Sequence, residues 1–116
     1  MILDRNLNQD GKGKYALVRL RGIEKGSEAH SLLLRLFELG YLDWGVVGDA
    51  DEFFVIKLRD KFSFQALKAY ADEVEKAADD PGIGSRESVR LSRYALDVMK
   101  LARRSGVQSP FCKEPD

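Results

Sequence analysis

The sequence predicts an α+β fold with the element order β-α-β-β-α-α. Apolar residues alternate with polar ones in three short stretches, which is typical of strands. In three longer stretches they recur every three or four residues, which indicates amphipathic helices. Short connections that contain glycine separate these stretches. We therefore expect a small antiparallel sheet with the helices packed on one face.

The first strand is expected over residues 14–21, KYALVRLR, where every second residue is apolar on one side. A helix should follow, because an apolar stripe begins after Ser27 and stops before Gly40. Serine is a preferred N-cap residue, and glycine readily adopts the left-handed conformation that ends a helix. We therefore expect Ser27 and Gly40 to bound this helix.

Two further strands are expected over residues 41–48 and 52–59, joined by a hairpin turn at GDAD. The second of them, EFFVIKLR, would be a central strand. In that register Phe54, Ile56 and Leu58 point toward the helices and form part of the core.

The helical period returns after Phe62 and continues to the connection DDPGIG at 79–84. Ser85 is the expected cap of a last helix that runs to about Ser105, and Gly106 is expected to stop it. The second half of the chain should therefore contribute two helices joined by a short connection.

A chain of 116 residues is long enough for one domain with its own core. We assign that domain to residues 1–106 and an irregular tail with two prolines to 107–116. The first five elements have the order of a ferredoxin-like fold that lacks its last strand. That likeness concerns element order and carries no function.

Charge and composition exclude several classes of protein. Nineteen basic and nineteen acidic residues cancel, so no net field attracts the chain to nucleic acid or to an anionic membrane. Cys112 is the only cysteine, which rules out an intrachain disulfide and indicates a reducing compartment. The sequence shows no signal-peptide core and no apolar run of about 20 residues. We therefore expect a cytoplasmic protein.

We expect no catalytic residue, no cofactor and no metal site. Asn6, Asn8 and Asp10 have the spacing of the first half of a calcium loop, but Leu17 stands where such a loop needs a bidentate Glu. The acids in GDADE have no further ligand at suitable spacing. His30, the only histidine, belongs to no nucleophile signature, so we interpret it as a surface or capping residue.

The outer face of the predicted sheet is a candidate surface for nucleic acid or for a homodimer. Two strands carry aromatic and basic residues on this face: Tyr15, Leu17, Arg19, Arg21, Phe53, Val55, Lys57 and Arg59. Sheets that read RNA stack bases on such aromatic residues and hold phosphates with such cations. However, the third strand lacks the glycines that let bases approach, and the zero net charge removes most of the electrostatic affinity.

The last predicted helix has the clearest charge pattern. Five basic residues lie along one line of it: Arg86, Arg90, Arg93, Lys100 and Arg104. Residues 81–106 hold six basic and two acidic side chains, whereas residues 60–80 hold three basic and six acidic ones. We favour ion pairing between these two oppositely charged helices, and the alternative is an acidic partner on the same stripe.

The stretches DEFFVIKLRDKF and ALKAYADE, with the ending SPFCKEPD, resemble small uncharacterised proteins encoded by phages and prophages. The resemblance covers about residues 51–116. Such proteins share no established activity, so no functional residue is transferred. The resemblance implies an accessory protein that acts inside a bacterium by binding a host or phage protein.

The sequence therefore predicts a non-enzymatic accessory protein that binds a protein partner in the bacterial cytoplasm. The first alternative is a nucleic-acid-binding module that uses the aromatic and basic sheet face. The second alternative is a regulator that binds a small ligand or a nucleotide.

Overall fold

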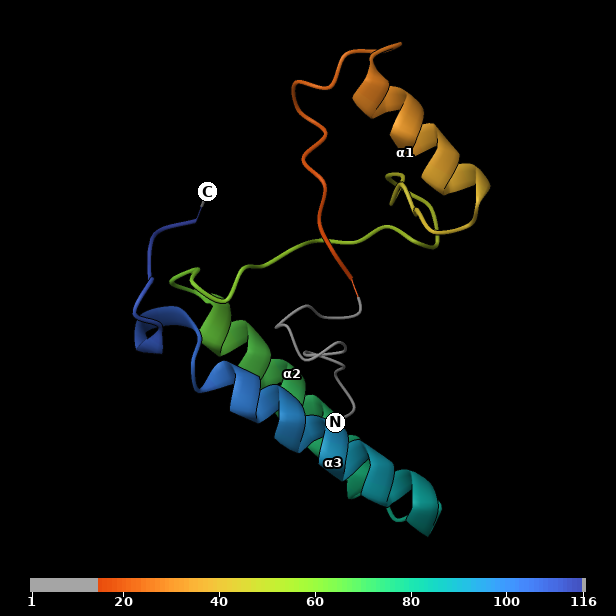
Figure 1. Ribbon diagram of the computed structural model, residues 1–116. Helices are drawn as coiled ribbons and strands as arrows, with labels where there is room; N and C mark the ends of the chain where they lie inside the picture. Colours follow the sequence, from red (N-terminus) through yellow and green to blue (C-terminus); the bar gives the residue numbers. More distant parts are fainter. Residues whose placement is uncertain (1–14, 116) are drawn as a thin grey trace, which may run out of the picture. The chain divides into compact units, whose positions relative to one another are not determined.

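The computed structural model describes residues 15–115, in which the regular elements are helical (Figure 1). The elements are α1 (Glu28–Glu38), α2 (Ser63–Ala78), α3 (Ser85–Ala102) and the 3₁₀ turn η1 (Gly106–Gln108). The predicted α+β fold with a ferredoxin-like element order is therefore wrong. The predicted helices are present, but over the described residues the strands are not.

No sheet forms within residues 15–115, where an isolated parallel bridge joins Asp60 and Lys113. Alternation of apolar residues shows which side of a strand would be buried. A strand also needs a neighbour to pair its N–H and C=O groups, and alternation does not report one. Phe54 is 88% exposed and Ile56 44% exposed, so the predicted central strand does not supply the core.

The described residues form two compact units. We call Tyr15–Val55, which contains α1, the single-helix unit, and residues 56–115 the hairpin unit. That residues 1–106 form a single domain stays a prediction.

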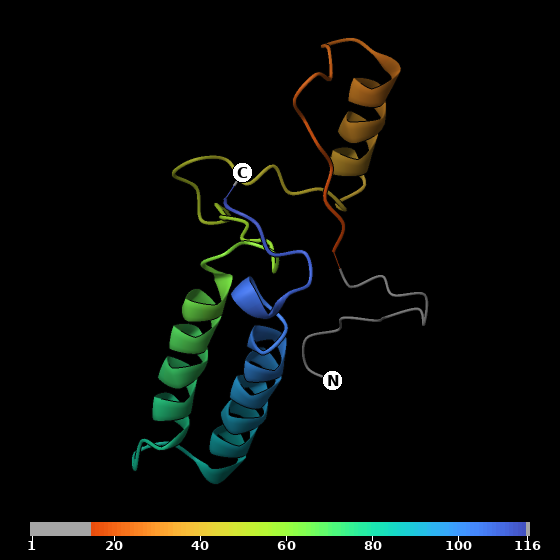
Figure 2. The ribbon, with the colours of Figure 1, turned by 90° about the vertical axis from the view of Figure 1, so that its left-hand side faces the viewer.

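In the hairpin unit, α2 and α3 lie side by side and run in opposite directions, as both ribbon views show (Figures 1 and 2). Their buried apolar residues are small: Ala71 and Ala78 from α2, and Ala95, Val98 and Ala102 from α3. Small side chains at these positions let two helices approach closely. The Ser88 hydroxyl in α3 also donates to the carbonyl of Ala78 at 2.7 Å, which satisfies a carbonyl at the end of α2.

The other end of the hairpin is closed by the segments before α2 and after α3. The buried Ser63 hydroxyl donates to the carbonyl of Leu58 at 2.8 Å, and the same carbonyl accepts from Gly106 N at 2.8 Å. Lys61 N donates to the carbonyl of Lys113 at 2.9 Å. These bonds fix the tail after α3, which was predicted to be irregular, against the start of α2.

In the single-helix unit, the predicted ends of α1 are confirmed. The Ser27 hydroxyl accepts from His30 N at 3.2 Å and is the N-cap. At the other end Gly40 has φ +84°, and Gly40 N and Tyr41 N donate to carbonyls of the last turn at 3.0 Å. This is a Schellman motif, which requires the left-handed conformation that glycine adopts without strain.

The ends of α3 differ from the prediction. Gly84 is the N-cap and makes no side-chain cap bond, so Ser85 is the first helical residue and not the cap. The helix ends at Ala102, and Arg103 is its C-cap. Gly106, with φ +59°, begins the 3₁₀ turn that leads the chain back toward Leu58.

Candidate binding site

The structure places four of the five residues of the predicted basic stripe on one helix. Arg86, Arg90, Arg93 and Lys100 lie on α3, and all four are exposed. Arg104 is exposed as well but lies two residues beyond the end of α3, so it does not continue the helical line.

The stripe faces away from α2. Helical residues are spaced about 100° apart, which puts Arg86 about 180° and Arg93 about 160° around α3 from the buried Ala95. The ion pairs that the structure shows within α2 and α3 run along single helices: Lys68 to Asp72 at 2.9 Å in α2, and Arg90 to Glu87 in α3. The predicted ion pairs between basic α3 and acidic α2 are therefore not among those that the described residues make.

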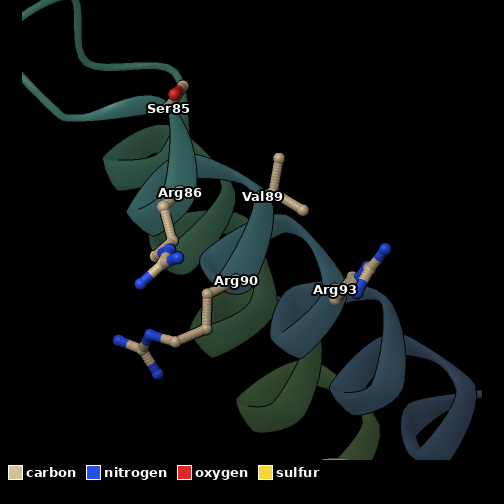
Figure 3. A pocket seen from close by; sticks show the side chains of 5 residues that line it. All are labelled: Ser85, Arg86, Val89, Arg90 and Arg93. Atoms are coloured by element: carbon tan, nitrogen blue, oxygen red, sulfur yellow. The ribbon is translucent and has the colours of Figure 1, made fainter.

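The N-terminal half of the stripe borders an open concavity of about 490 Å³. Its lining consists of Ser85, Arg86, Val89, Arg90 and Arg93. Figure 3 shows the Arg86 and Arg90 side chains extending to one side of Val89 and that of Arg93 to the other. We call this surface the arginine face. Val89 is 50% exposed and adds apolar surface between the arginine side chains.

One of the three arginines has a partner within α3. Arg90 Nε donates to both carboxylate oxygens of Glu87, at 3.2 and 3.1 Å. This bond lowers the pKa of Glu87 and raises that of Arg90, mainly through the hydrogen bond itself. Among the described residues, Arg86 and Arg93 make no ion pair and no side-chain hydrogen bond.

The start of α3 adds to the positive potential of the arginine face. The first N–H groups of a helix lack intrahelical acceptors, and the helix dipole leaves a partial positive charge there. Gly84 offers no side chain to accept from these groups. The carboxylate of Glu87 offsets part of this charge and pairs with Arg90, so Arg86 and Arg93 are the arginines of this face without an ion-pair partner among the described residues.

The residues of the predicted nucleic-acid or dimer face do not come together on a sheet. Tyr15, Leu17, Arg19 and Arg21 are exposed in the single-helix unit and belong to no helix or strand, and the same holds for Phe53 and Val55. Lys57 and Arg59 belong to the hairpin unit. The Phe53 ring lies against Gly45, where a Cβ would be 2.2 Å from ring atom Cε1. The sheet on which this surface was predicted is therefore absent from the described residues.

The candidates for metal binding that the structure describes make hydrogen bonds to nearby backbone. Among residues 15–115 no cluster of three or more His, Cys, Asp and Glu is arranged to hold a metal ion. Glu52 accepts from Gly48 N at 3.0 Å and so stabilises the turn at GDAD. His30 Nδ1 accepts from Gly26 N at 3.1 Å, which confirms a capping role for that histidine. Asn6, Asn8 and Asp10 lie outside the described residues.

Sequence reasoning missed a second concavity, which lies between α2 and α3 and has a volume of about 400 Å³. We call it the interhelical groove. It is lined by Ala71, Asp72, Glu75, Ser92, Ala95, Leu96 and Met99. The signal in the sequence was the pair of alanines at facing core positions, because a small side chain leaves a depression at the flank of a helix pair.

The chain matches no protein-family model, no curated protein and no solved structure. The resemblance to phage and prophage proteins therefore stays a prediction. In the part of the chain that the structure describes, no helix has the combination of length and apolar character needed to cross a membrane.

Proposed function

We propose that this chain is a non-enzymatic binding protein that docks an acidic segment of a partner protein on the arginine face of α3. We place this activity in the bacterial cytoplasm, in a phage-type accessory role. The observation that carries the proposal is the exposure of Arg86 and Arg93, which have no ion-pair partner among the described residues.

The chemistry of the arginine face defines the ligand. A guanidinium group can bind a carboxylate through two parallel hydrogen bonds, whereas an ammonium group acts as a point charge. Arg86 and Arg93 are seven residues apart, which is about 10 Å along a helix. A matching segment would carry two carboxylates at that separation. Acidic residues about seven apart on a helix, or about three apart in an extended chain, meet this condition.

Three features favour a protein partner over nucleic acid. The lining of the arginine face contains no aromatic residue on which a base could stack. The neighbouring helix α2 carries Asp72, Glu73 and Glu75, which repel a long phosphate backbone. The net charge of the chain is zero, so long-range attraction to a polyanion is weak.

The lining also favours binding over catalysis. Ser85 is the only hydroxyl among the five lining residues, and they include no histidine, cysteine or carboxylate to act as its base. The concavity lies open on the outer side of α3, whereas small-molecule sites enclose most of their ligand. A peptide that lies along the helix fits this shape better than a nucleotide.

The test is binding of a fluorescent Glu-rich peptide to the full chain, followed by fluorescence anisotropy. The same peptide with Gln in place of Glu, and single-stranded RNA and DNA of equal charge, are the competing ligands. The variant Arg86→Glu/Arg93→Glu removes the site. Its matched control, Arg35→Glu/Lys76→Glu, reverses two exposed cations that pair with acids on their own helices.

We expect the Glu-rich peptide to bind and the Gln peptide not to bind. Because two charge-assisted contacts become repulsive, the site variant should lose at least about tenfold in affinity. The control variant has the same net charge and should stay within about twofold. Equal losses in both variants would show that net charge alone drives binding. Tighter binding of RNA or DNA than of the peptide would assign the arginine face to nucleic acid.

A further inference from the structure

The interhelical groove has an apolar floor. Leu96 and Met99 of α3 line it together with Ala71 and Ala95, the alanines at the contact between the two helices. Leu96 is 50% exposed, and the two alanines are too small to fill the space beside it. The floor is therefore apolar surface that a bound segment can remove from water.

The opposite flank of the hairpin is bridged by two aromatic side chains. Tyr70 precedes Ala71 and Tyr94 precedes Ala95, whereas the groove residue Leu96 follows Ala95, so the tyrosines lie on the other side of the helix contact. The two rings have their centroids 6.1 Å apart and their hydroxyl oxygens 3.3 Å apart. Within the described residues, the flank that offers an open apolar floor between α2 and α3 is therefore the groove flank.

The α2 edge of the groove is acidic, and the described residues that line the groove include no cation. Asp72 and Glu75 lie three residues apart on this edge. Asp72 pairs with Lys68 of the same helix at 2.9 Å, whereas Glu75 makes no ion pair among the described residues. Glu75 Oε1 accepts from the Ser92 hydroxyl at 3.3 Å, which leaves further lone pairs of this carboxylate for an added donor. A ligand for the groove should therefore carry positive charge beside an apolar surface.

We propose that the interhelical groove binds a basic amphipathic helix of a partner protein. The apolar side of such a helix lies on Leu96 and Met99, which is the helix-in-groove mode of recognition. Methionine is flexible and polarisable, so Met99 adapts to different apolar side chains. Lysine or arginine at the margin of the apolar side reaches Glu75, and charge complementarity sets the orientation of the partner helix.

This site takes a ligand of opposite charge to that of the arginine face. The linings of the two surfaces share no residue. Binding of a basic helix to the groove does not depend on the proposed function, so either proposal can fail while the other holds.

The test is a nuclear magnetic resonance titration of the full chain, isotope-labelled at its methionine methyl groups. The chain has two methionines, and the variant Met99→Leu identifies the signal of the groove. The probe is a peptide of about 14 residues of leucine and lysine, with the leucines on one helical face, and is nearly as long as α2. The comparison peptide has glutamate in place of lysine.

We expect the lysine peptide to shift the Met99 signal. The glutamate peptide should bind the groove at least about tenfold more weakly, because its carboxylates meet the acidic edge. Binding of the glutamate peptide to the arginine face would leave the Met99 signal in place, so the two sites are read separately.

Two pairs of variants separate local contacts from net charge. Glu75→Lys reverses the acid of the groove, and Glu73→Lys makes the same change in charge on α2 outside the groove lining. Leu96→Ser removes apolar surface from the floor, and Leu32→Ser makes the same change at an exposed position of α1. Each groove variant should weaken binding of the lysine peptide at least about fivefold, and each control should stay within about twofold. All four positions are exposed, so circular dichroism should show unchanged helix content.

Three results would overturn the proposal. The first is a Met99 signal that does not move with the lysine peptide at up to about 1 mM. The second is a loss of affinity in either groove variant that is no larger than the loss in its control. The third is a Met99 signal that moves with protein concentration in the absence of peptide, which would assign the groove to a second copy of this chain.

Discussion

The hairpin unit and the single-helix unit both contain amphipathic helices, but they bury very different amounts of apolar surface. In the hairpin unit α2 and α3 bury five apolar residues against each other, and Ser63 and Ser105 are fully buried at one end. In the single-helix unit, the described residues include one buried apolar side chain, that of Leu33 at 6% exposure. Val47 and Phe54 in the same unit are 86% and 88% exposed.

The formation of a helix and its packing therefore have separate causes in this chain. Ser27 and Gly40 end α1 through bonds to nearby backbone, and these bonds need no partner helix. Helices α2 and α3 have poorer N-caps, because neither Phe62 nor Gly84 makes a side-chain cap bond. They are stabilised instead by the apolar face that each offers the other across a short connection.

The largest expected effect comes from the same substitution made in both units. Val98→Asp puts a charge at a position that is 3% exposed and should cost at least about 4 kcal/mol or prevent folding of the hairpin unit. Val47→Asp, at 86% exposure, should stay within about 0.5 kcal/mol. Urea unfolding followed by circular dichroism measures both. Similar losses at the two positions would mean that the units do not differ in burial as described.

Two glycines with positive φ, one in each unit, differ in the space around them. At Gly106, with φ +59°, a side chain would be crowded, because a Cβ would lie 3.0 Å from Phe64 Cβ and 3.2 Å from the Lys61 carbonyl oxygen. Gly22, at φ +90°, has nothing within 4 Å of that position. Alanine should therefore cost about 1 kcal/mol at Gly22 and about 2 to 4 kcal/mol at Gly106, measured by the same urea titration. Equal costs would show that the tail is not packed on the start of α2.

The sequence predicts structure well where the signal is local and poorly where a distant segment decides. Gly40 was predicted to end α1, and it does, because the signal and its effect lie within the same turn. Phe54 and Ile56 were predicted to be core residues of a strand, and they are exposed. Strand formation depends on a partner segment elsewhere in the chain, and alternation in EFFVIKLR carries no information about that partner.

The candidate site was partly predictable, because the spacing of its residues along the helix is a local signal and the packing of that helix is not. Arg86, Arg90 and Arg93 share a helical face, so periodicity places them together as soon as α3 is predicted. Which way that face points depends on which residues of α3 meet α2, and opposite net charges suggested the wrong side. The small core residues decide the packing, since Ala95 and Ala71 allow a close approach of the two helices.

A third, smaller effect is expected from substitutions at the N-terminal ends of α1 and α3. Ser27→Ala removes the acceptor for His30 N and should destabilise α1 by about 1 kcal/mol. Ser85→Ala should change stability by less than about 0.3 kcal/mol, because Gly84 is the N-cap of α3 and Ser85 is not. Trp44, the only tryptophan, lies 6.2 Å from the Phe37 ring of α1, and its fluorescence reports the first change. A larger cost at Ser85 than at Ser27 would reverse the assignment of the caps.

The smallest expected effect is a difference in how stability depends on pH in the alkaline range. The hydrogen bond with Tyr70, and then burial, raise the pKa of Tyr94 above its usual value of about 10. The folded state therefore holds this proton more tightly than the unfolded state, and stability falls as pH rises from about 10 through the folded pKa. Tyr94→Phe should reduce this fall in melting temperature. Parallel pH profiles for the native chain and the variant would contradict the assignment.

Hydrogen exchange along the full chain, with and without the Glu-rich peptide, measures both where the stable core lies and where the peptide binds. We expect α2 and α3 to form the stable core and the start of α3 to be the binding face. In the free chain, amides of α2 and α3 should exchange most slowly and those of α1 at least about tenfold faster, because α1 buries so little. The peptide should slow exchange mainly over residues 85–93. Equal protection of α1 and α3, or peptide protection confined to other residues, would contradict the account.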